Sequence, residues 1–271
     1  MAGETFLGQL RDAVLKETRD LPSDECRVRG LWRTELLFQP FPAERLFRYT
    51  YLLVQTASEG CCYTDEAVPL DERLLGQDAR SAWSGYRSLD IAILDALCGS
   101  LPRDPSATFR LAGSSSQKSM ARARIVVDEV FHQTRDRNHA PTVLNVGAVG
   151  AIIGELQSRG ARVFATDLEP SIVGNHINGV QVMDGSENER LTQECDAVVA
   201  TGMTIFTGGL PRIIEVARRS GTKVVLFAET GANMGPVLCR LGVDSVVGEP
   251  FPFYIFSAES LVRIHRAENS G

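Results

Sequence analysis

The sequence predicts an α/β protein in which a Rossmann-like parallel sheet follows an N-terminal, mostly helical cap domain. Residues 142–169 carry the main signal, because they read as a strand, a glycine-rich turn, a helix and a second strand that ends at an acidic residue. Apolar strand segments then alternate with helical segments, as in a parallel sheet with crossover helices. The first 140 residues lack this alternation, so we expect a cap at 1–140 and a nucleotide-binding domain at 141–271.

Two amphipathic segments predict helices in the cap. Apolar residues recur with helical spacing over residues 6–15 and again over residues 89–97, where Gly99 ends the pattern. The stretch between them, residues 32–63, is rich in aromatic side chains. We expect most of these side chains to lie in the core of a helical or mixed domain.

A serine-rich turn precedes a third helix near the end of the cap. Residues 113–116 read Gly-Ser-Ser-Ser, and Lys118 follows within the first helical turn. Backbone amides, hydroxyls and the positive end of the helix dipole suit a carboxylate, so Ser115 and Lys118 are candidate ligand contacts. The alternative is that serine only caps the helix. The polar linker 135–141, which ends in proline, predicts the domain boundary.

The glycine-rich turn and the acid after the second strand form the candidate nucleotide site. Gly147 and Gly150 follow an apolar strand, and Asp167 comes twenty positions after Gly147, the spacing at which a carboxylate meets ribose hydroxyls. Asn145, near the end of the first strand, is a further candidate contact. The middle glycine of the G-x-G-x-x-G motif is absent, so S-adenosylmethionine fits better than a dinucleotide with its pyrophosphate. The alternatives are a dinucleotide site and glycines that serve packing alone.

Loops after the later strands supply the other candidates, because ligands of such sheets lie beyond the carboxyl ends of the strands. Strands are expected at 179–182, 196–200, 223–227 and 243–247, with a closing strand or two within 253–264. We expect Asp184 to accept a hydrogen bond from an adenine amino group, with capping of a helix as the alternative. Thr201, Gly202 and Thr204 bring small residues close to a ligand. Glu229 either faces the pocket or caps the helix that follows it.

The segments TGMTIFTGG and KVVLFAETGANMGPVLCRLGVDSVVGEPF resemble the Rossmann-like heavy-metal chelation family. The first loop keeps the family's Thr201, Gly202, Thr204 and Gly208, whereas Met203 and Thr207 depart from its pattern, and the last segment keeps Gly242, Val243, Asp244 and Gly248. The resemblance runs from Thr142 onward. It is moderately specific for the fold and weak for the reaction.

The architecture is also similar to class I methyltransferase-like enzymes that consume S-adenosylmethionine as a substrate. Azetidine-2-carboxylate synthases and enzymes that make 1-aminocyclopropane-1-carboxylate without pyridoxal phosphate close its aminobutyrate arm into a small ring and release methylthioadenosine. The resemblance implies this activity here, with Lys118, Tyr254 and Thr204 as candidate catalytic residues. The aromatic residues that we expect closest to the sulfonium are Phe206, Phe251, Phe253 and Tyr254, with a place in the core as the alternative for each. An ordinary small-molecule methyltransferase and a non-catalytic metallophore- or nucleotide-binding module are the alternatives.

Composition limits the partners that the protein is expected to have. A formal net charge of -6 disfavours nucleic acid and anionic membrane surfaces. The chain lacks an apolar run of spanning length, and its polar start is unlike a signal peptide. Its six cysteines include no C-x-x-C pair, so we expect a reduced, cytoplasmic protein with no metal site. A small-molecule substrate is the expected partner, and a homodimer stays open.

Overall fold

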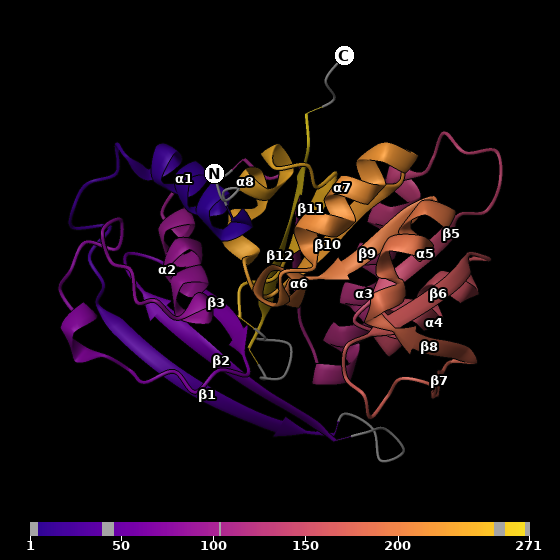
Figure 1. Ribbon diagram of the computed structural model, residues 1–271, viewed down its shortest axis with the longest axis horizontal. Helices are drawn as coiled ribbons and strands as arrows, with labels where there is room; N and C mark the ends of the chain where they lie inside the picture. The colour runs from indigo at the N-terminus through magenta and orange to yellow at the C-terminus, as the bar shows by residue number, and fades with distance from the viewer. Residues whose placement is uncertain (1–4, 40–45, 103, 252–257, 269–271) are drawn as a thin grey trace.

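The computed structural model describes residues 5–39, 46–102, 104–251 and 258–268. The described chain forms a three-stranded antiparallel sheet and a nine-stranded, mostly parallel sheet. In Figure 1 the small sheet, in indigo and purple, lies to the left of the large one. The protein therefore has the α/β fold with a mostly parallel central sheet that the sequence predicts.

The small sheet and two helices form the cap. The elements are α1 (Phe6–Thr18), β1 (Gly30–Phe38), β2 (Phe47–Gln55), β3 (Glu59–Thr64), the 3-10 helix η1 (Glu72–Leu74) and α2 (Arg87–Gly99). Helices α1 and α2 confirm the two predicted helices, and α2 packs on β2 and β3.

The aromatic-rich stretch of the cap forms strands because its side chains alternate with a period of two. Leu52 and Val54 join the apolar core under α2, whereas Tyr51, which directly precedes Leu52, forms a hydrogen bond with Glu229, directly after a strand of the large sheet. The cap is thus mixed, with more strand than the mostly helical domain that the sequence predicts.

The large sheet and its helices follow. The first elements are β4 (Ala107–Leu111), α3 (Ser115–Gln133), β5 (Thr142–Val146), α4 (Gly150–Ser158), β6 (Arg162–Asp167), β7 (His176–Ile177), β8 (Val180–Asp184), η2 (Gly185–Glu187) and α5 (Asn188–Glu194). The remaining elements are β9 (Ala197–Thr201), α6 (Met203–Thr207), α7 (Leu210–Ser220), β10 (Lys223–Ala228), η3 (Ala232–Met234), α8 (Gly235–Arg240), β11 (Ser245–Gly248) and β12 (Ser260–Arg266). The strands predicted after residue 141 are confirmed, with ends shifted by one or two residues; residues 252–257 lie outside the described chain.

The strand order is β4-β12-β11-β10-β9-β5-β6-β8-β7. Six adjacent strands, from β8 to β11, run parallel, and β12 is antiparallel to both β11 and β4. Counted along the chain, the six parallel strands have the Rossmann order 3-2-1-4-5-6. The order reverses between β5 and β9, which is where ligands bind in such sheets.

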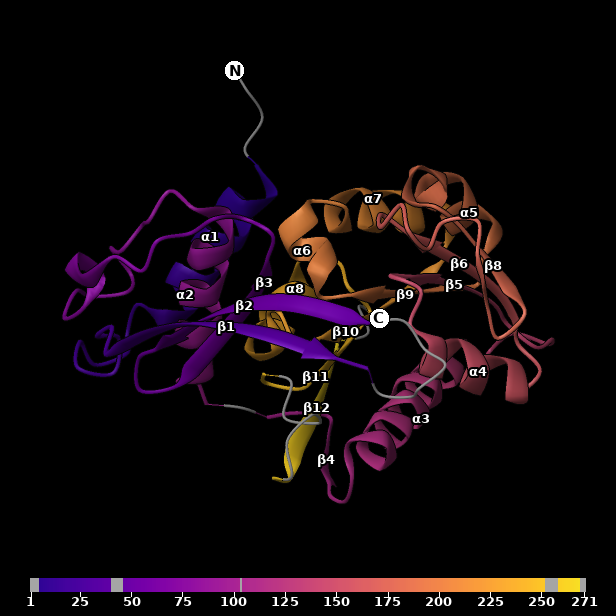
Figure 2. The same ribbon diagram turned by 90° about the horizontal axis from the view of Figure 1, so that it is seen from below.

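Helices cover both faces of the large sheet. In Figure 2, α3 and α4 lie below the sheet and α5, α6 and α7 lie above it. Apolar side chains of α3 and α4 pack with one face of the strands, and those of α7 and α8 join the other face to the core of the cap. No helix within the described residues is long and apolar enough to span a membrane.

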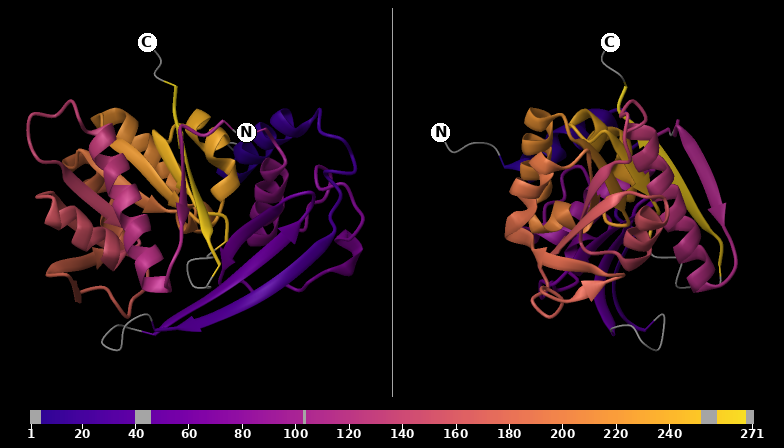
Figure 3. Two further views of the ribbon diagram at one scale, coloured as in Figure 1. Left: turned by 180° about the vertical axis from the view of Figure 1, so that it is seen from behind. Right: turned by 90° about the vertical axis from the view of Figure 1, so that its right-hand side faces the viewer.

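Strand β4 and helix α3 precede residue 141, yet both belong to the large sheet. β4 pairs with β12, and α3 packs on β9, β10 and β11 beside α4. The left panel of Figure 3 shows α3 running across the face of the large sheet. The chain therefore crosses from the cap to the large sheet between α2 and β4. That two independent domains meet at residue 140 stays a prediction.

Candidate functional site

The carboxyl ends of the parallel strands meet at one edge of the large sheet, and most of the predicted site residues lie there. Gly147 follows β5 with φ +100°, and a Cβ atom on it would lie 2.8 Å from Cγ2 of Thr201 at the end of β9. A Cβ atom on Gly202 would overlap the carbonyl of Thr230, after β10. The loops after β5, β9 and β10 are therefore in contact, and only glycine fits at positions 147 and 202.

Asn145 supports the glycine turn from inside the sheet. Its side chain is fully buried, its Nδ2 donates to the carbonyl of Val199 at 3.3 Å, and its Oδ1 accepts from the amide of Val149 at 2.8 Å. These bonds tie β5 to β9 and position the start of α4. Gly150, the first residue of α4, would carry a Cβ atom 3.3 Å from Ile177.

The two predicted acids, Asp167 and Asp184, lie side by side at the ends of β6 and β8. Asp167 is half-buried, and its carboxylate accepts a hydrogen bond from the amide of Glu169 at 2.9 Å. Asp184 is exposed and caps η2, and hydrogen bonds from Ser186 lower its pKa. Capping is thus confirmed for Asp184, and its contact with adenine stays a prediction.

Thr204 and the serine turn make local contacts. The Thr204 hydroxyl donates to the Thr201 carbonyl at 2.7 Å within the first turn of α6. Ser114 caps α3 in a reciprocal capping box with Gln117, which confirms the capping alternative, and Ser115 is the first residue of that helix. A ligand contact at this turn stays a prediction.

Lys118 is one of the largest fully buried side chains. Its ammonium group donates to the Ala258 carbonyl at 2.6 Å, next to the start of β12 at the carboxyl edge. Tyr254, the third predicted catalytic residue, lies outside the described residues.

Aromatic rings of the cap lie over this edge. Tyr49, Tyr51 and Tyr63 contact one another edge to face, with ring centroids 6.0 to 6.2 Å apart. Tyr63 also contacts Phe206 of α6 at 5.9 Å, and Tyr51 contacts Phe251 at 6.1 Å. Burial and the nearby carboxylates of Asp65, Glu169 and Asp167 raise the pKa of Tyr63. We call Tyr49, Tyr51 and Tyr63 the tyrosine group.

Beneath the tyrosine group, Arg122 of α3 joins two glutamates that follow adjacent strands. Its Nη1 atom lies 3.2 Å from Oε1 of Glu229, after β10, and 3.0 Å from Oε2 of Glu249, after β11. The Tyr51 hydroxyl donates to the other oxygen of Glu229 at 2.8 Å. We call Arg122, Glu229 and Glu249 the arginine–glutamate cluster.

Glu229 is the titratable group of this cluster at neutral pH. Burial raises its pKa to about 7; Arg122 and the Tyr51 hydroxyl oppose that rise, and Glu249 adds to it. The side chain is 13% exposed, so a bound molecule can reach it. A perturbed carboxyl group at the carboxyl edge of a parallel sheet is typical of an acid–base residue.

Sequence reasoning found Glu229 as one of two alternatives and missed its partners. Arg122 lies 107 and 127 positions from Glu229 and Glu249, a separation that no local pattern reveals. The available signals were the acid two positions after the predicted strand at 243–247 and a cation one helical turn after Lys118.

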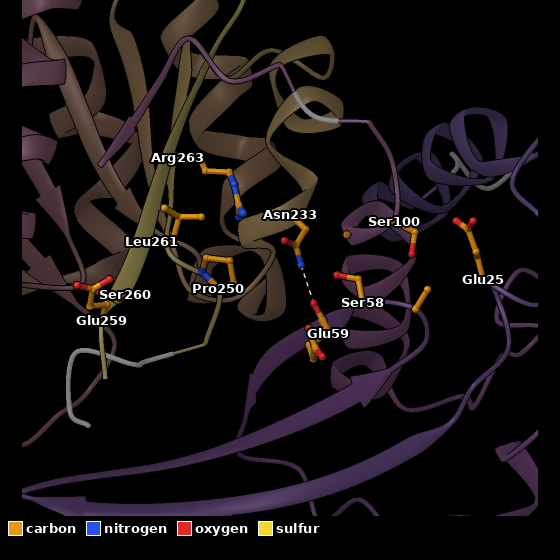
Figure 4. A pocket seen from close by; sticks show the side chains of 12 residues that line it. Glu25, Ser58, Glu59, Ser100, Asn233, Pro250, Glu259, Ser260, Leu261 and Arg263 are labelled. Carbon is orange, nitrogen blue, oxygen red and sulfur yellow. Dashed lines mark hydrogen bonds between the residues drawn. The ribbon is translucent and has the colours of Figure 1, made fainter. Parts of the chain in front are cut away.

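A cavity of about 560 Å³ lies beside β12, between the cap and the large sheet. Figure 4 shows Arg263, Leu261 and Ser260 on one side and Ser58, Glu59 and Ser100 on the other, with the Asn233 amide bonded to the Glu59 carbonyl. None of the residues predicted to hold a nucleotide lines this cavity. We place the candidate site at the glycine turn and the arginine–glutamate cluster, where the perturbed carboxyl group lies.

Metal-binding side chains do not gather within the described ranges. No group of three or more His, Cys, Asp or Glu residues there could hold a metal ion. All six cysteines are buried and free of disulfides, and burial raises the pKa of Cys61 and Cys62 well above the usual range.

Residues 129–249 match the model of the DUF364 family, described as "Putative heavy-metal chelation". Two solved structures of DUF364 proteins with unknown function are similar to the chain along most of its length. The one from Pyrococcus horikoshii is 12% identical, with a TM-score of 0.57, and the comparison covers 96% of this chain and 99% of that one. The one from Desulfitobacterium hafniense is 15% identical, with a TM-score of 0.57 and coverage of 96% and 98%. No curated protein sequence matches this chain.

These comparisons support the fold and the family resemblance of the matched segment. That segment runs from the end of α3 to Glu249 and contains the loops at 201–208 and 242–248 on which the resemblance rests. At these identities the two structures show a shared fold, including the combination of the cap with the large sheet.

Proposed function

We propose that the protein binds S-adenosylmethionine at the carboxyl edge of the large sheet and closes its aminobutyrate arm into a small-ring amino acid, releasing methylthioadenosine. The observation that carries the proposal is Glu229, because a carboxyl group with a pKa of about 7 accepts protons at neutral pH. It lies between the guanidinium of Arg122 and the hydroxyl of Tyr51. The six buried cysteines, none of which forms a disulfide, suit a reducing, cytoplasmic setting.

The edge offers a partner for each part of this substrate. The Gly147 turn and Asp167 suit the adenosine. The tyrosine group suits the sulfonium, since a cation near an aromatic face gains about 0.5 to 2 kcal/mol. The start of α3, with Ser115 and Lys118, suits the carboxylate. Two strands separate β6 from β10, so Asp167 and Glu229 lie about 14 Å apart along the edge, which leaves room for a nucleoside with a short arm.

The proposed reaction needs a substrate held in the correct conformation and one base. The α-nitrogen attacks Cγ, the Cγ–S bond breaks, and its electron pair stays on sulfur as a neutral thioether. One proton of the α-ammonium group passes to the Glu229 carboxylate, which balances the charges. Holding the nitrogen in line with the Cγ–S bond lowers the barrier by about 7 to 11 kcal/mol.

The strength of this base favours the four-membered ring. A free α-amino group has a pKa of about 8, close to that of Glu229, so proton transfer between them is nearly balanced. Attack by carbon requires loss of a far less acidic C–H proton. The pKa of Glu229 therefore favours azetidine-2-carboxylate over 1-aminocyclopropane-1-carboxylate as the proposed product.

The strand order favours one other function. Six parallel strands in the order of a dinucleotide-binding sheet make a dinucleotide oxidoreductase the second candidate. Val149 stands where such a site carries its second motif glycine, and its side chain packs on the core under α3 and α4. The glycine that lets the backbone approach a pyrophosphate closely is therefore absent, which ranks this candidate second.

Incubation of the purified protein with S-adenosylmethionine alone separates these candidates. Methylthioadenosine and azetidine-2-carboxylate in equal amounts, identified by mass spectrometry, would support the proposal. S-adenosylhomocysteine formed only after an acceptor is added would indicate a methyltransferase. Binding without turnover would indicate a binding module, and binding of a nicotinamide dinucleotide instead would indicate the second candidate.

A further inference from the structure

One carboxylate oxygen of Glu249 is buried and has no hydrogen-bond partner among the described residues. The residue is fully buried, and its Oε2 atom accepts from Arg122 at 3.0 Å. Within the described residues its Oε1 atom has no hydrogen-bond partner. Because an unpaired buried oxygen of a carboxylate is costly, this atom calls for a donor from beyond the described residues, and a bound ligand can supply one.

The surroundings of Glu249 favour a cationic donor. Two carboxylates share the guanidinium of Arg122, so the arginine–glutamate cluster carries one more negative than positive charge when both glutamates are ionised. Lys118, one turn earlier on α3, donates to a backbone carbonyl. Glu249 directly follows β11, and Phe251, two residues later, contacts the Tyr51 ring. The cluster therefore lies at the carboxyl edge, under the cap.

We propose that Glu249 and Glu229 form a subsite for a primary ammonium group, with Oε1 of Glu249 as its anchor. An ammonium group brings three donors and one positive charge, which match the unpaired oxygen and the excess negative charge. The inference rests on the proposed function, in which the ligand is the α-ammonium group of S-adenosylmethionine. It adds that the site selects amino-bearing adenosyl compounds and that Glu249 positions the nitrogen beside Glu229.

Two adenosyl ligands test this subsite on the unmodified protein. Methylthioadenosine has no ammonium group, whereas S-adenosyl-3-thiopropylamine has one and lacks the carboxylate. Calorimetry should show that the amine binds about tenfold to a hundredfold more tightly, the value of hydrogen bonds to a charged group. Equal affinities would overturn the ammonium subsite while leaving the adenosyl site intact. If neither compound binds, the proposed function fails, and the subsite fails with it.

Glu249→Gln locates the anchor. The variant keeps the size of the side chain and removes its charge, so the preference for the amine should shrink by about tenfold while methylthioadenosine binds as before. Glu259→Gln, at an exposed acid near the start of β12, is the matched control and should keep the full preference. Full preference in folded Glu249→Gln would contradict the role of Glu249. The ligand comparison on the unmodified protein remains decisive where that variant does not fold.

Discussion

At the scale of single residues, Asp167 and Asp184 are two neighbouring acids whose roles can be compared. Both end parallel strands, but only Asp167 is near enough to the tyrosine group to raise the pKa of Tyr63. We expect Asp167→Ala to weaken methylthioadenosine binding by about 1.5 to 3 kcal/mol, the value of hydrogen bonds to a charged group. Asp184→Ala should have a smaller effect, because its carboxylate already caps η2. Unchanged affinity in folded Asp167→Ala, measured by calorimetry, would remove it from the site.

Glu229 makes folding stability depend on pH. Its pKa is about 7 in the folded protein against an ordinary value of 4.5, so the folded state holds the extra proton between these values. The contribution of Glu229 to stability is therefore full below pH 4.5 and is lost as pH rises through 7, by about 3 kcal/mol in all. Chemical denaturation of the protein and of Glu229→Gln should give stabilities whose difference shifts by about 2.5 kcal/mol between pH 5 and 8, most of the full amount. A constant difference would contradict the raised pKa.

Single residues also show what a sequence can predict. Gly147 was recognised because a turn leaves a local glycine signature, and its φ of +100° explains the glycine. A Cβ atom at position 147 would overlap the Thr201 side chain, so a bulkier residue there would disturb folding. Gly147→Val therefore cannot test ligand binding by itself. The arginine–glutamate cluster was missed because its partners meet only when α3 packs across β10 and β11.

At the scale of elements, helix α3 supplies two buried cations next to the carboxyl edge of the large sheet. It places Lys118 and Arg122 on one buried stripe near its N-terminus. The sequence predicted this helix and its serine cap, and it predicted the parallel strands from their apolar runs. It did not predict the small sheet, because antiparallel pairing of β1, β2 and β3 leaves only a period-two pattern in a stretch read as aromatic core.

We make a separate prediction for Lys118, near the N-terminus of α3. If Lys118 reaches the substrate carboxylate, Lys118→Met should slow methylthioadenosine release from S-adenosylmethionine by more than about tenfold, a positioning effect. Affinity for methylthioadenosine, which lacks the carboxylate, should hardly change. Lys16→Met, at an exposed lysine of α1, is the control. Unchanged turnover, or equal weakening of both ligands, would leave Lys118 as a purely structural residue that bonds to Ala258.

At the scale of the whole molecule, Asp95 of α2 fastens the cap to the large sheet. Its Oδ2 atom accepts from the backbone N–H of Cys61 in β3 at 2.9 Å, and its Oδ1 atom accepts from the backbone N–H of Asn233 in η3 at 2.8 Å. The side chain is buried, so both bonds are shielded from water. This link holds the tyrosine group over the carboxyl edge of the large sheet.

Loss of the link should destabilise the protein. Asp95→Asn turns one acceptor into a donor that faces a backbone N–H group, and we expect a loss of about 2 to 4 kcal/mol in the free energy of unfolding. Asp128→Asn, at an exposed residue paired with Arg159, should cost less than about 1 kcal/mol. Denaturation curves compare the two variants directly. Equal small losses would show that Asp95 does not fasten the cap.

We propose that the whole molecule turns S-adenosylmethionine over without a second substrate, with Glu229 as the base. The most direct test measures methylthioadenosine release from S-adenosylmethionine alone at pH 8 by the protein and by Glu229→Gln. We predict steady release by the unmodified protein, matched by an equal amount of ring amino acid. We predict that release by the variant is about a hundredfold slower or more, as for loss of a general base. No release by the unmodified protein, or equal rates for both, would contradict the claim.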